Sequence, residues 1–222
     1  DDLAGPALLT LCAPACETIY VGKRAGHHHV RQEATNDLLI LHARRGRRVV
    51  RLKGGDPFIF GRGGEEIEAL ARAGIPCEVV PGVTAATAAA AATGIPLTHR
   101  EFASGVLFLT GHECDGKKYP AIDWALVARL RTTLCLYMGV RKLPEIAARL
   151  RTGGLAADTP VAVISRASQP GQSTATCTLG EVSSHPAVEA DAPALVIIGA
   201  VAAFPEKIAI LAADSSTLAG VS

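Results

Sequence analysis

The sequence predicts an α/β fold with parallel-type sheets. Runs of apolar, β-prone residues alternate with segments of helical periodicity along most of the chain. Glycine or alanine recurs directly after several of these runs, which is typical of the ligand-binding edge of open α/β sheets. With 222 residues, the chain can form one large domain or two lobes of about 100 residues each, and two lobes would leave a cleft.

Seven runs have the composition of strands, because β-branched and apolar residues dominate them and turn-forming residues often follow. They are residues 18–21, 47–53, 77–80, 106–110, 133–137, 161–164 and 194–198. Such strands, alternating with helices, favour parallel pairing.

Helices are predicted between several of the strands. In residues 32–45, Ala34, Leu38 and Leu41 follow helical spacing, and Gly46 supplies a stop. Residues 65–73 end in the same way at Gly74. The alanine-rich residues 85–92 predict a tightly packed, buried helix.

Composition excludes several classes of protein. The apolar fraction is 49%, but alanine supplies much of it and no apolar run reaches the roughly 20 residues of a membrane span. The net charge of +1 is too small for a strong field toward nucleic acid or anionic membranes. Because no secretory leader pattern is present, we expect a cytoplasmic protein. We also expect it to bind neither nucleic acid nor a membrane. The six cysteines form no CxxC pair, and we expect buried thiols at Cys12, Cys16, Cys77, Cys114, Cys135 and Cys177.

Small residues follow five of the predicted strands, in the segments 53–57, 81–84, 110–112, 138–139 and 165–167. For any single loop, a glycine that merely turns the chain is the better explanation. Five such loops together favour a ligand cradle, because small residues let the backbone approach a ligand closely.

The segment 51–66, RLKGGDPFIFGRGGEE, carries the strongest signal. Its glycine spacing fits neither a P-loop nor a dinucleotide fingerprint, so the residues alone support only a small-molecule site for a nucleoside or a carboxylate. Basic residues near the glycine-rich segments suit an anionic substrate, although for each one alone a solvated surface position is the simpler explanation. They are Lys23, Arg24, Arg31, Arg51, Lys53 and Arg62. The run His27–His29 lacks paired metal-ligand spacing, and we predict no metal.

Taken together, the motifs resemble those of the uroporphyrinogen-III C-methyltransferases within the tetrapyrrole methylase group. The motifs are VGKRAG (21–26), LKGGDPFIFGRGGEE (52–66), PGVTAA (81–86), GIPLTHR (94–100), TGH (110–112) and YMG (137–139). The likeness runs in order from Asp1 to about Phe204. It implies the two-lobed tetrapyrrole methylase (class III methyltransferase) fold, with S-adenosylmethionine in the cleft between the lobes and, usually, a homodimer. We expect an N-terminal α/β lobe at 1–103, without the family's first strand and its glycine-rich loop, and a C-terminal α/β lobe at 104–222.

The resemblance also implies an activity, which is methylation of uroporphyrinogen III at C2 and C7. The product is precorrin-2, formed by way of precorrin-1, and the cofactor leaves as S-adenosylhomocysteine. A related precorrin or rRNA methylase and a non-catalytic binding module are the alternatives, and the product could feed sirohaem, cobalamin or haem d1.

Site residues carry over by position. Cofactor contacts fall on Gly54, Gly55, Asp56, Ile59, Thr84, Ala85, Met138 and Ala167. The proton acceptor falls on Asp1, with Asp2 as an adjacent competitor, and the proton donor on Lys23. We expect Arg62 to bind a carboxylate of the substrate, whereas pairing with Glu65 or Glu66 is its structural alternative.

Overall fold

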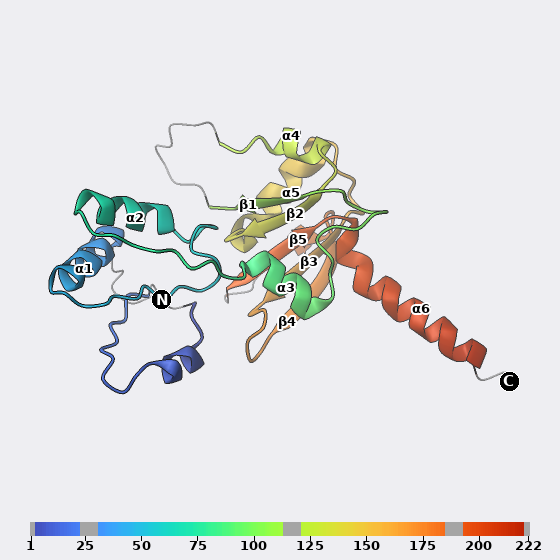
Figure 1. The fold of residues 1–222 in the computed structure, drawn as a ribbon. Coiled ribbons are helices and arrows are strands. Elements are labelled where there is room, and N and C mark those ends of the chain that lie inside the picture. Colours follow the sequence, from blue (N-terminus) through green and yellow to red (C-terminus); the bar gives the residue numbers. More distant parts are fainter. Residues whose placement is uncertain (1–2, 23–30, 113–120, 185–192, 220–222) are drawn as a thin grey trace. The chain divides into compact units, whose positions relative to one another are not determined.

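The computed structural model describes residues 3–22, 31–112, 121–184 and 193–219 (Figure 1). The chain forms two compact units, Asp1–Thr84 and Ala85–Ser222. Asp1, Asp2, Lys23, Arg24, His27–His29 and Cys114 lie outside the described residues. The division into lobes at residues 103 and 104 stays a prediction.

The first unit is built from helices and extended segments. It contains a short 3-10 helix, Pro6–Leu11, followed by α1 (Gln32–Arg44) and α2 (Gly63–Arg72), which pack together. Gly46 and Gly74 follow the two helix ends at φ values of 73° and 70°, a left-handed conformation that glycine adopts readily. Both predicted helices and their stops are therefore confirmed, although α2 begins two residues earlier than expected.

The predicted strands 18–21, 47–53 and 77–80 are wrong for this structure. These segments form no strand in the part of the chain that is described. Val50 and Val80 are 78% and 73% exposed, so their β-branched side chains have no packed face. Composition alone favours an extended backbone, but a strand also needs a hydrogen-bonded neighbour.

The second unit contains a five-stranded sheet of order β1-β2-β5-β3-β4. Its strands are β1 (Val106–Thr110), β2 (Thr133–Tyr137), β3 (Pro160–Ser165), β4 (Ser173–Thr178) and β5 (Ala194–Ile198). Only β1 and β2 pair in parallel, while the β2–β5, β5–β3 and β3–β4 pairs are antiparallel. The expected parallel sheet is thus wrong, and the sheet is mixed.

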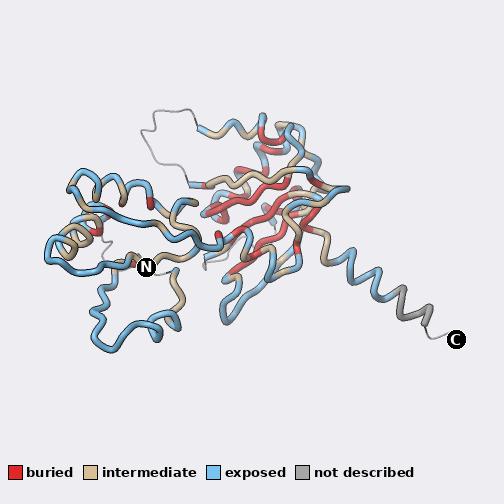
Figure 2. The backbone as a smooth tube through the Cα atoms, in the orientation of Figure 1, coloured by how far each residue is buried: buried red, intermediate tan, exposed pale blue. Residues whose placement is uncertain are grey.

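Helices cover both faces of this sheet. Leu136, Val163 and Val196 point into a core shared with α4 (Trp124–Arg129) and α5 (Leu143–Thr152). Because side chains alternate along a strand, Tyr137 faces the opposite side, where its hydroxyl contacts α3 (Ala85–Thr93). Figure 2 shows that buried residues concentrate in the central strands, which are covered on both faces.

The remaining elements of the second unit lie at its connections and at its C-terminal side. Among the described residues of this unit, three 3-10 turns span Val140–Lys142, Val182–Ser184 and Ala200–Ala203. The last of them leads directly into α6 (Phe204–Ala219). No helix among the described residues is long and apolar enough to cross a membrane.

Helix α3 is half-exposed, because only Ala86 and Ala89 are completely buried. The expected fully buried helix is therefore correct for one face only. The Tyr137 hydroxyl accepts a hydrogen bond of 3.0 Å from the Ala86 backbone N–H. That N–H lies in the first turn of α3, where no helical carbonyl can satisfy it, so Tyr137 acts as a cap from a neighbouring element.

Replacing Tyr137 by phenylalanine should lower the free energy of unfolding of the second unit by about 1–3 kcal/mol, because the buried Ala86 N–H loses its partner. The single tryptophan, Trp124, lies in the same unit, so urea titration followed by its fluorescence measures the effect. Tyr20→Phe is a matched control, since Tyr20 lies in the other unit and is 62% exposed. Equal unfolding midpoints for both variants would refute the capping role.

The cysteines differ from expectation. Cys12, Cys16 and Cys77 are exposed, whereas Cys135 is buried in β2 and Cys177 is partly buried. Burial raises the pKa of the Cys135 thiol to about 12, which keeps it protonated and unreactive. The expectation of buried thiols is confirmed at Cys135 and wrong at the three exposed positions.

Candidate functional site

The glycine-rich segment forms a turn that is held by its own aspartate. The Asp56 carboxylate accepts hydrogen bonds from the backbone N–H groups of Phe58, at 2.9 Å, and Gly82, at 3.2 Å. These bonds lower the pKa of Asp56, so the group stays ionised near neutral pH. Asp56 therefore ties the glycine loop to the segment that leads to Thr84.

Glycine is needed here for packing of backbone on backbone. A Cβ atom on Gly82 would lie 2.5 Å from the Gly55 carbonyl oxygen, and one on Gly54 would lie 2.7 Å from the Leu3 carbonyl oxygen. Gly55 itself has a φ of 76°. The predicted loops 53–57 and 81–84 therefore do contact each other. This contact between the loops is part of the reason why both contain glycine.

A buried ion-pair network closes the base of the glycine loop. Lys53 Nζ lies 3.2 and 3.0 Å from the two carboxylate oxygens of Glu66, and Arg51 Nε lies 3.1 Å from one of them. Gln32 of α1 donates a further hydrogen bond of 3.1 Å to Glu66. Lys53 and Glu66 flank the loop in sequence, and each side chain is only 6% exposed. The network therefore fixes where the loop begins and ends.

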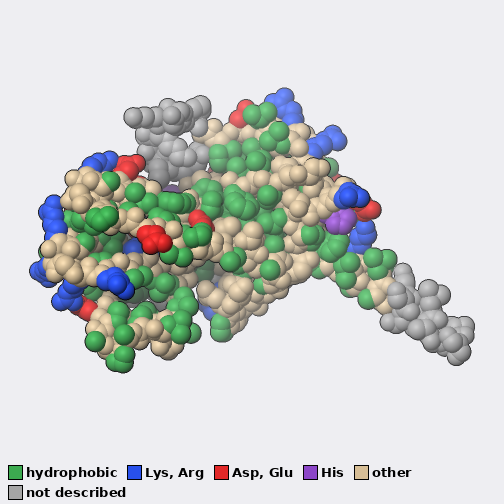
Figure 3. Space-filling model, viewed as in Figure 1, with side chains coloured by type: hydrophobic (Ala, Val, Ile, Leu, Met, Phe, Trp, Pro, Cys, Tyr) green, Lys and Arg blue, Asp and Glu red, His purple; other side chains and the backbone are tan. Residues whose placement is uncertain are grey.

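This role differs from the one that the sequence predicts. Arg51 and Lys53 are expected among the cations suited to an anionic substrate, whereas in the structure both are paired with Glu66. The available signal was the position of Lys53 immediately before the glycines and of Glu66 immediately after them. In Figure 3, exposed Lys and Arg side chains lie along the first unit over α1.

Arg62 precedes α2 in a left-handed conformation, with a φ of 60°. Its guanidinium contacts Glu65 through Nε, at 2.9 Å, and Nη2, at 2.5 Å. This is the alternative pairing that the sequence allowed. Because the two side chains are 44% and 54% exposed, the pair adds little stability and a ligand carboxylate could replace Glu65 at small cost.

The strand ends of the second unit also have unusual backbone. Met138 follows β2 at a φ of 52° and is 56% exposed. Arg166 and Ser168, which flank Ala167 after β3, have φ values of 51° and 62°. Left-handed conformations are strained for non-glycine residues, and they cluster at functional sites.

The predicted cofactor residues gather into two groups, one in each unit. Gly54, Gly55, Asp56 and Ile59 share one turn, to which Gly82 binds two residues before Thr84. In the second unit, the bond between Tyr137 and Ala86 places the start of α3, where Ala85 lies, against the side chain of the residue that precedes Met138. Ala167 lies at the same edge of the sheet, because β2 and β3 run in the same direction on either side of β5.

Comparison with known proteins shows the family. Residues 1–183 match the family model described as Tetrapyrrole (Corrin/Porphyrin) Methylases. This chain belongs to the tetrapyrrole methylase family. The chain is 52% identical over 210 residues to siroheme synthase 1 of Yersinia enterocolitica, a match that covers 94% of the chain and 44% of that relative. It is also 52% identical to the siroheme synthase of Neisseria meningitidis, with 94% and 43% covered. The chain thus spans less than half the length of these curated relatives.

Solved structures agree with the family and with the predicted fold. Uroporphyrin-III C-methyl transferase from Thermus thermophilus, complexed with S-adenyl homocysteine, is 42% identical to this chain, with a TM-score of 0.72. The match covers 88% of this chain and 81% of that one. A cobalt precorrin-4 methyltransferase is 27% identical over 91% and 82% of the two chains, with a TM-score of 0.76. The tetrapyrrole methylase fold predicted from the motifs is therefore confirmed.

Proposed function

We propose that this methylase transfers methyl groups from S-adenosylmethionine to C2 and then C7 of uroporphyrinogen III. The products are precorrin-1 and then precorrin-2. The observation that carries the proposal is the 42% identity to the Thermus enzyme, which holds S-adenyl homocysteine in its structure. The segment GGDPFIFGRGGEE adds support, because it contributes the strained turn, the ordered Asp56 and the exposed Arg62.

The cofactor would be held by Gly54, Gly55, Asp56, Ile59 and Thr84 from the first unit. Ala85, Met138 and Ala167 would hold it from the second. The left-handed backbone at Gly55 and Met138 fits such a role, because it turns peptide groups out of regular pairing. The sulfonium of the bound cofactor supplies an activated methyl group. The chain's own residues then align the carbon nucleophile and move one proton per transfer, with Asp1 as acceptor and Lys23 as donor.

Gly55→Val should weaken S-adenosylmethionine binding by about 10- to 100-fold, because a β-branched residue at this φ distorts the turn and fills the site. Calorimetric titration measures the affinity. Gly46→Val is a matched control, since Gly46 has a φ of 73° and open space around it. If both variants bind the cofactor like the parent protein, the glycine turn is not part of the cofactor site.

Arg62 should contact a carboxylate of the substrate in place of Glu65. Losing a charge-assisted hydrogen bond of about 1.5–3 kcal/mol should lower kcat/KM roughly 10- to 150-fold. Arg62→Gly removes the side chain without straining the backbone, because glycine suits the φ of 60°. This variant should therefore preserve or raise the melting temperature. Arg62→Lys should recover only part of the activity. If Arg62→Gly keeps the wild-type kcat/KM, Arg62 does not bind the substrate and its role is limited to the ion pair with Glu65.

Three finer features belong to the same proposal. We propose a homodimer, as the resemblance to the family implies, and a cytoplasmic location. The names of the curated relatives favour siroheme as the end product.

A non-catalytic tetrapyrrole-binding protein is the competing function. Transfer of radiolabel from methyl-labelled S-adenosylmethionine to uroporphyrinogen III separates the two. The proposed enzyme labels the macrocycle in a time- and enzyme-dependent manner. A binding protein retains uroporphyrinogen III in equilibrium dialysis and leaves it unlabelled.

A further inference from the structure

The loop between β3 and β4 carries one of the proposed cofactor contacts. Residues 166–172 connect the two strands, which pair with each other along their full lengths. Ala167 lies between Arg166 and Ser168, whose φ values are 51° and 62°. Left-handed backbone costs free energy in residues other than glycine, and it persists only where surrounding contacts hold it. The contacts that hold this loop therefore control how Ala167 is presented.

The sequence of the loop produces two consecutive turns. The Gln169 N–H donates to the Arg166 carbonyl at 2.9 Å, and the Gln172 N–H donates to the Gln169 carbonyl at 3.0 Å. Pro170 and Gly171 occupy the centre of the second turn. Gly171 has a φ of 81°, which a type II turn requires after a central proline. This turn reverses the chain and returns Gln172 toward the first turn.

The side chain of Gln172 bridges the strained part of the loop and α3. Its Oε1 accepts a hydrogen bond of 2.7 Å from the Ser168 backbone N–H, and its Nε2 donates one of 3.4 Å to the Ala92 carbonyl. The orientation of the amide follows from its partners, because a backbone N–H only donates and a carbonyl only accepts. Glutamine suits this position because its amide carries an acceptor and donors at the end of one side chain.

Helix α3 is held at both ends by side chains from other elements. The Tyr137 hydroxyl binds the Ala86 N–H in the first turn, and Gln172 binds the Ala92 carbonyl in the last turn. The first N–H groups and the last carbonyls of an α-helix have no partner within the helix, so both bonds use groups that are available. Through α3, Gln172 connects the loop after β3 to the end of β2.

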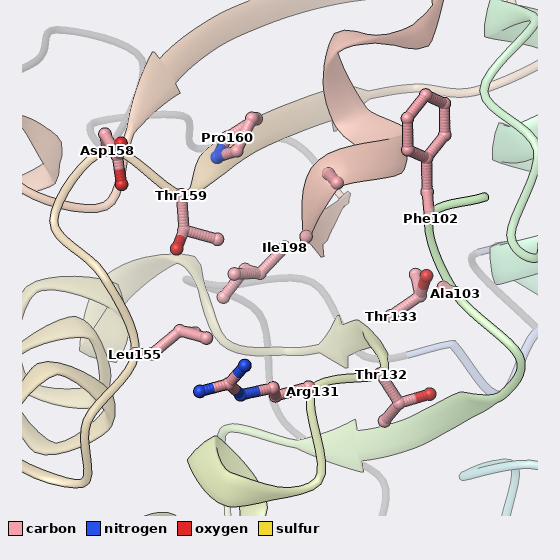
Figure 4. A pocket seen from close by; sticks show the side chains of 12 residues that line it. Phe102, Ala103, Arg131, Thr132, Thr133, Leu155, Asp158, Thr159, Pro160 and Ile198 are labelled. Carbon is pink, nitrogen blue, oxygen red and sulfur yellow. The ribbon is translucent and has the colours of Figure 1, made fainter.

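These contacts all lie at the edge of the sheet that carries the proposed cofactor residues. A depression of about 330 Å³ lies at the opposite edge, where Thr133 and Pro160 begin β2 and β3 (Figure 4). At about 3.3 Å per residue, strands of this length separate the two edges by roughly 15–20 Å. Gln172 therefore acts on the loop of Ala167 and not on the depression.

We propose that Gln172 is a positioning residue of the cofactor site. It holds Arg166 and Ser168 in their left-handed conformations and so presents the backbone of Ala167 to the cofactor. This inference rests on the proposed function, because Ala167 can contact the cofactor only if the methylase binds S-adenosylmethionine. Loss of the side chain should weaken cofactor binding without slowing the transfer step.

The test uses Gln172→Met, which keeps the size of the side chain and removes both hydrogen bonds. The dissociation constant for S-adenosylmethionine, measured by calorimetry, should rise about 3- to 10-fold, and the KM for the cofactor should rise with it. The kcat at saturating cofactor and the KM for uroporphyrinogen III should stay unchanged. Gln172→Glu should recover part of the affinity, because its carboxylate still accepts from Ser168 but cannot donate to Ala92.

Gln169→Met is the matched control, since Gln169 is exposed in the same loop and joins both turns through its backbone. It should bind the cofactor like the parent protein. Parental affinity in Gln172→Met would overturn the inference, as would no recovery in Gln172→Glu. A lower melting temperature and kcat of Gln172→Met with both KM values unchanged would also overturn it, because the residue would then only stabilise the fold. If the parent protein itself does not bind S-adenosylmethionine, the proposed function fails, and this inference fails with it.

Discussion

Glu66→Gln should lower the free energy of unfolding of the first unit by about 3–5 kcal/mol. The substitution preserves size but removes the negative charge between Lys53 and Arg51, and it leaves a buried cation without compensation. Urea titration followed by circular dichroism measures the change. Affinity for S-adenosylmethionine should fall as well, because the network fixes both ends of the glycine loop.

The neighbouring carboxylate provides a matched control. Glu65→Gln breaks the exposed pair with Arg62 and should cost at most about 1 kcal/mol. The expected contrast comes entirely from burial, since the two glutamates are adjacent on α2. Similar losses for the two variants would show that the network does not stabilise the unit.

The pH dependence of Glu66→Gln follows from Lys53. Burial lowers the pKa of Lys53 from its ordinary value of 10.5, and the hydrogen bond to Glu66 opposes that shift. Without Glu66 the folded-state pKa drops further, so the unfolded chain holds more protons between that pKa and 10.5. Stability of the variant should therefore rise, relative to the parent protein, as pH increases toward 10.5. A deficit that is constant with pH would contradict this assignment.

Asp1→Asn should slow methyl transfer by about 10²–10⁴-fold while cofactor affinity stays nearly unchanged. The reason is that the amide cannot accept the proton that the macrocycle loses when the methyl group is added, and general base catalysis typically contributes this factor. Single-turnover kinetics with labelled cofactor isolates the transfer step. Asp2→Asn is the control and should have a far smaller effect. Greater sensitivity at Asp2 would shift the assignment by one residue, and insensitivity at both positions would remove the base from this segment.

The sequence predicted the second unit better than the first, for a physical reason. Strands β2, β3 and β5 are buried on both faces, so each appears in the sequence as a short continuous apolar run. Strand β4, with the sequence STATCT, was missed because it is polar and lies at the sheet edge. Strand direction was mispredicted because composition does not encode which neighbour a strand pairs with. In the first unit, residues 47–53 have strand composition but no strand partner among the described residues.

The candidate site was predictable as a set of loops but not as a set of contacts. Glycines in the 53–57 and 81–84 segments marked two loops that Asp56 does join. Their spacing could not show that Glu66 would bind Lys53, because that contact depends on how α2 returns against the preceding segment. Arg62 illustrates the same limit, since its pairing with Glu65 depends on a left-handed turn that sequence alone does not specify.

The most direct test of the central proposal is the position and number of methyl groups in the product. Uroporphyrinogen III is incubated with the protein and ¹³C-methyl S-adenosylmethionine, and the product is analysed by ¹³C NMR. We expect two labelled methyl groups per macrocycle at completion, at C2 and C7, with the C2 signal appearing first. A macrocycle without label, or label at any other carbon, would contradict the proposed function.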